Sequence, residues 1–202
     1  MTFLIVVITS NSASSAIQIG ESERPEFKRL AGLALNRLEV AYSPSIQRLL
    51  RAAREATRVI TIREITDDQS TWHRHGDRTR AHTQPGDGES KKLGRSTPVD
   101  AILFLPLDAI EPTERRWSSG VFVHELVHAV DLVYGRYHSD YRIRERRAVF
   151  FQNQWRADTD TPLRTHYHGR FDTLDFQDHQ KRQSIQAFLR HFYSRPDLLS
   201  ED

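Results

Sequence analysis

Apolar residues recur along the chain at spacings that predict several helices and two strands. Intervals of three and four residues predict helices over 21–38, 45–56 and 184–193. Strict alternation predicts a strand over 59–65, and a dense apolar run predicts a second strand over 99–107, buried or lying at a sheet edge. The second helix has its own start signal, because Ser43 is a favourable cap and Pro44 suits a first helical position.

Three polar segments separate these elements. Residues 66–97 are rich in Asp, Gly, Ser, Arg and His, which predicts a flexible insertion. Residues 155–179 lack a steady period and are expected to form irregular structure over a site. The Ser-rich segment 1–20 is expected to precede a single domain over 21–202. Its apolar part, 3–8, is too short for a good signal peptide, and we expect no membrane insertion.

One predicted helix, between Ser118/Ser119 and Gly135, is apolar at nearly every position. Its polar exceptions are His124, Glu125, His128 and Asp131. Their spacing of i, i+1, i+4 and i+7 places them in one narrow stripe along the helix, whereas a solvent-exposed helix face would be broader. Buried polar groups need partners, so this stripe predicts a metal site or a water-filled cleft.

The stripe contains the pattern His-Glu-x-x-His, which places two imidazoles one helical turn apart on one face. His124 and His128 can therefore reach one ion, and Glu125 stands beside it. The chain has no cysteine, so a metal must be held by histidine and carboxylate. We expect one catalytic Zn²⁺, which takes three protein ligands and leaves a position for water.

Glu145 is the leading candidate for the third ligand. It shares a helix face with Ala148 and Val149, and its E-x-x-A element resembles that on the second helix of gluzincin-type proteases. Asp131 is the main rival, although one turn beyond His128 it is better placed to orient an imidazole. Less favoured ligands are Asp140, Asp158 and Asp172.

The ordered set of motifs resembles the NleD-type zinc metalloprotease effectors that Gram-negative pathogens inject into host cells by type III secretion. It consists of the run 124–131, Glu145-x-x-Ala148 and the run 163–171, and it extends over most of the chain. The resemblance implies secretion into the host cytoplasm and host signalling proteins as substrates, with mitogen-activated protein kinases as candidates. It also allows segment 1–20 to act as a secretion signal and a secretion chaperone to be a partner.

These patterns together predict an α+β, zincin-like zinc endopeptidase, with a small mixed sheet packed on the motif helix and a second, Glu-bearing helix. Glu125 is expected to act as general base. Tyr167 is our choice for the oxyanion donor, with His168 and Arg164 as alternatives. An extended substrate could pair with the edge of strand 99–107.

Two other classes of function remain open at this point. One is a zinc-stabilised binding module without turnover, against which the presence of Glu125 argues. The other is a nucleic-acid binder using Arg74, Arg78 and Arg80, but that region offers only Trp72 for stacking. The net charge of +2 is also small, so we expect no nucleic-acid partner.

Overall fold

The computed structural model describes residues 16–21, 23–65, 81–88, 94–107, 110, 120–159, 161, 163–164, 166–167 and 171–172. Within these residues the chain forms an α+β fold with four helices and a four-stranded mixed sheet. A separate two-stranded ribbon joins β5 (His166–Tyr167) to β6 (Phe171–Asp172). The predicted fold class is therefore confirmed at the level of α+β architecture.

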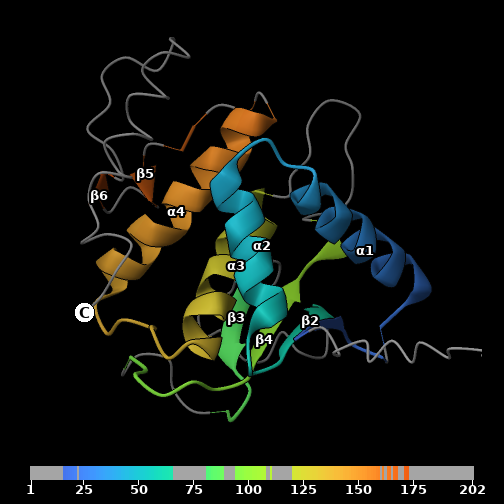
Figure 1. Ribbon diagram of the computed structural model, residues 1–202, viewed down its shortest axis with the longest axis horizontal. Coiled ribbons are helices and arrows are strands. Elements are labelled where there is room, and N and C mark those ends of the chain that lie inside the picture. Colours follow the sequence, from blue (N-terminus) through green and yellow to red (C-terminus); the bar gives the residue numbers. More distant parts are fainter. Residues whose placement is uncertain are drawn as a thin grey trace, which may run out of the picture.

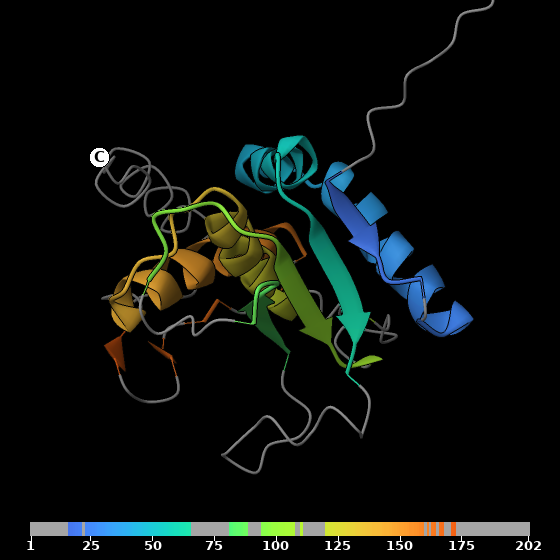
Figure 2. The ribbon, with the colours of Figure 1, turned by 90° about the horizontal axis from the view of Figure 1, so that it is seen from below.

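The main sheet has the strand order β1-β2-β4-β3 (Figure 2). Strands β1 (Ile17–Ile19), β2 (Ile60–Glu64) and β4 (Ala101–Leu105) are parallel. Strand β3 (His82–Pro85) runs antiparallel to β4 and forms one edge of the sheet. The expectation that strand 99–107 offers a free edge was wrong, because β4 is paired on both sides.

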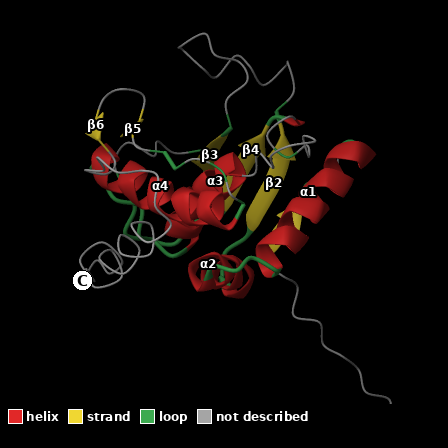
Figure 3. Cartoon of the chain, turned by 90° about the horizontal axis from the view of Figure 1, so that it is seen from above, coloured by secondary structure: helices red, strands yellow, loops and turns green. Residues whose placement is uncertain are grey.

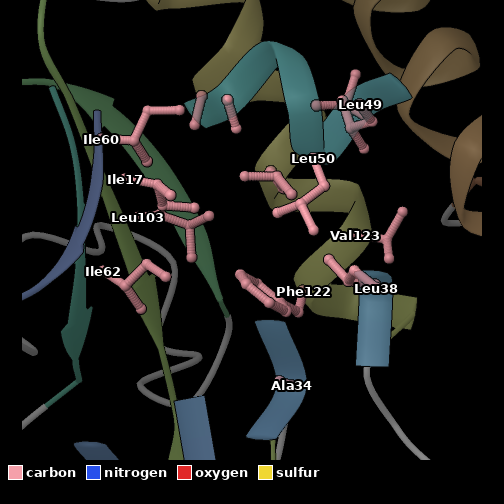
Figure 4. Packing of buried hydrophobic residues seen from close by; sticks show 14 of the residues in the cluster. Ile17, Ala34, Leu38, Leu49, Leu50, Ile60, Ile62, Leu103, Phe122 and Val123 are labelled. Carbon is pink, nitrogen blue, oxygen red and sulfur yellow. The ribbon is translucent and has the colours of Figure 1, made fainter. Parts of the chain in front are cut away.

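The four helices lie on one face of the sheet (Figure 1). They are α1 (Pro25–Glu39), α2 (Pro44–Glu55), α3 (Gly120–Val133) and α4 (Tyr141–Asp158). Alternate strand residues such as Ile60, Ile62 and Leu103 point at the helices, where Phe122 and Leu50 meet them (Figure 4). Burying this apolar face is what holds the two layers together. Among the described helices, none has the length and apolar character needed to cross a membrane.

The local sequence signals account for where α2 begins. Ser43 is the N-cap and Pro44 the first helical residue, as predicted. The Ser43 hydroxyl, however, does not cap the helix and instead donates to Gln154 Oε1 at 2.5 Å, while its backbone N–H donates to Asp158 at 2.8 Å. The start of α2 is thus fastened to α4.

Two predicted boundaries differ from the structure at strands whose sequences carry little pattern. Strand β3 lies inside the range 66–97, so that range is not a flexible insertion at residues 82–85, and Thr83 there is fully buried against α3. Strand β1 lies inside the N-terminal segment 1–20, and its Ile17 belongs to the core. Both strands are stabilised by pairing with distant strands, a contribution that a three- or four-residue pattern does not reveal.

Of the C-terminal predictions, one differs from the structure and one lies outside the described residues. Helix α4 continues to Asp158, so the irregular segment expected from residue 155 begins later than predicted. The helix predicted over 184–193 lies outside the described residues, as do residues 1–15.

Candidate metal centre

Helix α3 packs between α4 and the sheet (Figure 3), and the side chains of its polar stripe are buried. His124, Glu125, His128 and Asp131 are all between 3% and 8% exposed. The helix ends in a Schellman motif: Arg136 N–H donates to the Asp131 carbonyl at 2.7 Å, and Gly135 N–H donates to the Leu132 carbonyl at 3.1 Å. Gly135 adopts a φ of +66°, which glycine favours at this position.

Helix α4 brings Glu145 against this stripe. Its first turn is capped by Asp140, whose carboxylate accepts from Arg142 N–H at 2.8 Å. Ala148, one turn after Glu145, is fully buried, and its small side chain lets the two helices lie close together. Arg144, the residue before Glu145, is also buried and only 7% exposed.

The two imidazoles converge on the Glu145 carboxylate. His124 Nε2 lies 3.1 Å from Glu145 Oε2, and His128 Nε2 lies 3.4 Å from Glu145 Oε1. One donor atom from each of the three residues falls within 4.8 Å of the others. Ligands at about 2.0–2.2 Å from a tetrahedral zinc are about 3.3–3.6 Å apart, so the 3.4 Å spacing fits one ion and the 3.1 Å spacing is slightly shorter than that range. The group could hold a metal ion, and its nitrogen and oxygen donors suit zinc.

The electrostatics of Glu145 favour its anionic form. Burial by itself would raise the pKa of this carboxyl, but hydrogen bonds and charge interactions with His124 and His128 outweigh burial and hold the pKa well below its ordinary value. An ionised carboxylate is the form that binds a cation.

Glu125, the expected base, is held by a residue of β3. The Thr83 hydroxyl lies 2.9 Å from Glu125 Oε2 and 2.9 Å from the Glu125 backbone carbonyl. A hydroxyl has one proton, so it donates to one of these oxygens at a time. The contact fixes the Glu125 side chain relative to the sheet edge, beside the three candidate ligands.

Tyr137, in the turn between α3 and α4, and Arg144, in the first turn of α4, lie next to the cluster. The Tyr137 ring lies edge-on to His128 with a centroid separation of 6.0 Å, and the Arg144 guanidinium lies 4.7 Å above the same tyrosine ring. Burial raises the pKa of Tyr137; Arg144 opposes the rise, whereas Glu145, Glu125 and Asp131 add to it. The phenol is therefore neutral at physiological pH.

Asp131 occupies a different place from the three candidate ligands. Its Oδ1 lies 3.3 Å from Arg147 on α4, and it does not belong to the convergent group. We expected it to orient an imidazole, but His128 Nδ1 has no hydrogen-bond partner among the described residues. The Asp131–Arg147 contact instead joins the two helices that carry the site.

The other carboxylates considered as ligands have structural positions. Asp140 caps α4, and Asp158 accepts from the backbone of Ser43. For Asp172 and Tyr167 the structure describes only the backbone, in β6 and β5, so the expected role of Tyr167 stays a prediction, and His168 lies outside the described residues. Arg164 is held by α4: its guanidinium donates to Gln152 at 3.2 Å and its N–H to Asn153 at 2.7 Å.

Thr83 and Tyr137 are the two residues of this site that the sequence did not single out. Thr83 stands in a polar segment whose only structural signal is the Pro85-Gly86 pair that follows it. Tyr137 follows Gly135 by two residues, so its place just beyond a helix end was visible, but its contact with His128 was not.

The fold and the site together define an α+β protein with a buried His-His-Glu cluster carried by two adjacent helices next to a sheet edge. No protein-family model matches the chain, and comparisons with curated proteins and with solved structures found no match.

Proposed function

We propose that the chain is a zinc-dependent endopeptidase of zincin-like architecture. The observation that carries the proposal is the convergence of His124, His128 and Glu145 on one point, with Glu125 next to His124 and fixed by Thr83. Three nitrogen and oxygen ligands beside an independent carboxylate are what a hydrolytic zinc site requires.

In this proposal His124, His128 and Glu145 hold the ion. Bound zinc would supply Lewis-acid chemistry, polarising the scissile carbonyl and lowering the pKa of a water molecule toward about 7. Glu125 removes a proton from the attacking water and delivers it to the leaving amine, so that the C–N bond breaks without releasing an anionic nitrogen. Tyr167 stays our candidate donor to the oxyanion.

Thr83 gives this proton transfer a fixed geometry. When Glu125 is ionised, the Thr83 hydroxyl can donate to Oε2, and when Glu125 holds the proton, the hydroxyl can donate to the backbone carbonyl instead. Both oxygens are 2.9 Å away, so neither state of Glu125 obliges the threonine to move. We therefore assign Thr83 as a positioning residue for the base.

The substrate is expected to bind along β3. This strand forms a sheet edge, and its Thr83 contacts Glu125, so a peptide paired with it would pass the candidate ligands. Host signalling proteins, with mitogen-activated protein kinases as candidates, and action in the host cytoplasm are proposed on the sequence resemblance to NleD-type effectors alone.

The experiment combines metal analysis with terminus mapping of a host lysate treated with the protein or with its Glu125→Gln variant. We expect about one zinc per chain in both proteins, and new peptide termini with the wild type alone. Zinc in both proteins and new termini in neither would leave only a metal-stabilised fold. New termini with both proteins would refute Glu125 as the base.

The burial of the site favours one alternative, a zinc-stabilised binding module without turnover. The three candidate ligands are only 4–5% exposed and Glu125 is 8% exposed, which is also typical of a closed structural metal site. The same experiment separates the two functions, because a structural site requires no activity that depends on Glu125.

A further inference from the structure

A cavity of about 320 Å³ lies where α2, α3 and α4 meet, apart from the candidate metal centre. Figures 1 and 3 show these three helices next to one another. Each contributes apolar side chains to the wall, among them Leu49 and Ala52 from α2, Val127 and Val130 from α3, and Phe151 from α4. The volume is at the low end of what ligand-binding pockets have, so an occupant must be small.

Charged side chains in the wall are mostly cationic. Arg48, Arg136 and Arg147 line the cavity together with a single acid, Asp131, so three positive charges less one negative charge leave a net +2. Asp131 is paired with Arg147 at 3.3 Å, and both side chains are largely buried, at 4% and 13% exposed. Arg48 and Arg136 are exposed, which places their charge at the rim.

An apolar interior with an arginine rim selects for a particular kind of ligand. The apolar wall excludes a fully hydrated ion, because burying it without compensation is costly. A cationic ligand would meet like charges at the rim, whereas a carboxylate can accept two parallel hydrogen bonds from one guanidinium. The complement of this cavity is a small molecule with an apolar body and one anionic group.

We propose that the cavity between α2, α3 and α4 is a binding site for a small amphipathic carboxylate, whose apolar body contacts Val127, Val130 and Phe151 and whose anionic group meets Arg136 and Arg48. This site does not depend on the proposed peptidase activity. It does adjoin the helices of the metal centre, since Asp131 follows His128 by three residues and Arg147 follows Glu145 by two.

The test uses the full-length chain and three probes with the same eight-carbon body: octanoate, octanol and octylammonium. Equilibrium dialysis and thermal unfolding are measured with octanoate and octylammonium below their critical micelle concentrations and with octanol below its solubility limit. We expect saturable octanoate binding with a Kd below about 1 mM and a melting temperature that rises with its concentration. Octanol should bind several-fold more weakly, and octylammonium should not bind.

Two variants locate the binding. Arg136→Gln removes a rim charge and should weaken octanoate binding about three- to tenfold, without changing octanol binding. Ala52→Leu fills part of the cavity at a half-buried position and should abolish the binding of both octanoate and octanol. Arg142→Gln, an exposed arginine of α4 that does not line the cavity, is the matched control and should bind like the wild type.

Equal affinity for octanoate and octylammonium would overturn the assignment of an anionic ligand. Octanoate binding that is weaker than about 1 mM, or that survives unchanged in a folded Ala52→Leu variant, would overturn the site itself. Should Ala52→Leu fail to fold, the difference between Arg136→Gln and Arg142→Gln decides, because equal octanoate affinities in these two variants would refute the rim assignment.

Discussion

Replacing Glu145 by glutamine tests the metal centre most directly. The side chain is 5% exposed, and its two oxygens approach His124 and His128 at 3.1 and 3.4 Å. Glutamine has nearly the same size and keeps one oxygen as a hydrogen-bond acceptor, so the metal-free fold should survive. What disappears is the anionic donor, and with it the charge that faces a bound cation.

The size of the expected effect follows from the proposed role of Glu145 as a zinc ligand. Removing partners that only orient a ligand typically weakens metal binding about 10–100-fold, and the loss of a ligand itself should exceed that, so we expect zinc affinity to fall more than about 100-fold. At saturating zinc a 100-fold loss corresponds to about 2.7 kcal/mol of stabilisation. In a domain of this size the zinc-induced rise in melting temperature should therefore shrink by about 5–11 °C.

Zinc affinity is measured by competition against a chromophoric chelator, and melting is followed with and without zinc. Asp131→Asn changes the carboxylate that pairs with Arg147 and should weaken zinc about tenfold at most. Glu55→Gln, on the exposed end of α2, is the matched control and should bind like the wild type. Wild-type affinity in Glu145→Gln beside a large loss in Asp131→Asn would refute the ligand assignment.

Three further substitutions test the roles of Thr83, Gly135 and Asp158. Thr83→Val should lower kcat by about 10-fold or more with zinc affinity unchanged, because a hydrogen bond to a charged group is worth about 1.5–3 kcal/mol. Thr83→Ser keeps the hydroxyl and should restore kcat. Equal turnover in the wild type and both variants would remove Thr83 from the mechanism. Gly135→Ala should lower the free energy of unfolding by at least about 2 kcal/mol in denaturant unfolding, since φ is +66° and the new Cβ would lie 2.7 Å from the Ser96 carbonyl oxygen. An unfolding free energy equal to that of the wild type would contradict this crowding. Burial raises the pKa of Asp158, although hydrogen bonds from the backbones of Ser43 and Tyr42 oppose the rise. Asp158→Asn should therefore stabilise the protein at neutral pH, by less than about 1 kcal/mol because solvent screens this half-buried group. Protonation of the wild type favours the folded state, so this advantage should fade as the pH falls toward 3.8, and a growing advantage in acid would contradict the sign.

Sequence patterns predicted those elements whose own residues determine their burial. Ile60, Ile62 and Glu64 point inward as the alternation in 59–65 required, and α3 is buried along nearly its whole length, as its apolar composition required. Strand β3 escaped prediction because only Thr83 and Pro85 of its four residues are buried, and its pairing with β4 depends on residues some twenty positions away. Periodicity does not record such distant pairing.

Local sequence also accounts for only part of the candidate site, and the rest depends on contacts between distant segments. His124 and His128 share a face because a helix repeats every 3.6 residues, and no other part of the fold is needed to bring them together. Glu145 lies seventeen residues later, and a spacing of that length fixes neither the direction of α4 nor its rotation about its own axis. The turn between the helices must supply both.

The turn between α3 and α4 is positioned by residues other than the three candidate ligands. The backbone of Arg95 pairs with that of Tyr137 in both directions, at 2.6 and 3.1 Å, and Gly94 approaches Ser139 so closely that an added Cβ would lie 2.9 Å from its nitrogen. Arg144 then donates to the carbonyls of His138 and Ser139, which fixes the first turn of α4 one residue before Glu145. Segment 94–95 therefore helps to set the position of Glu145, the candidate third ligand, although the sequence of range 66–97 predicted only flexibility.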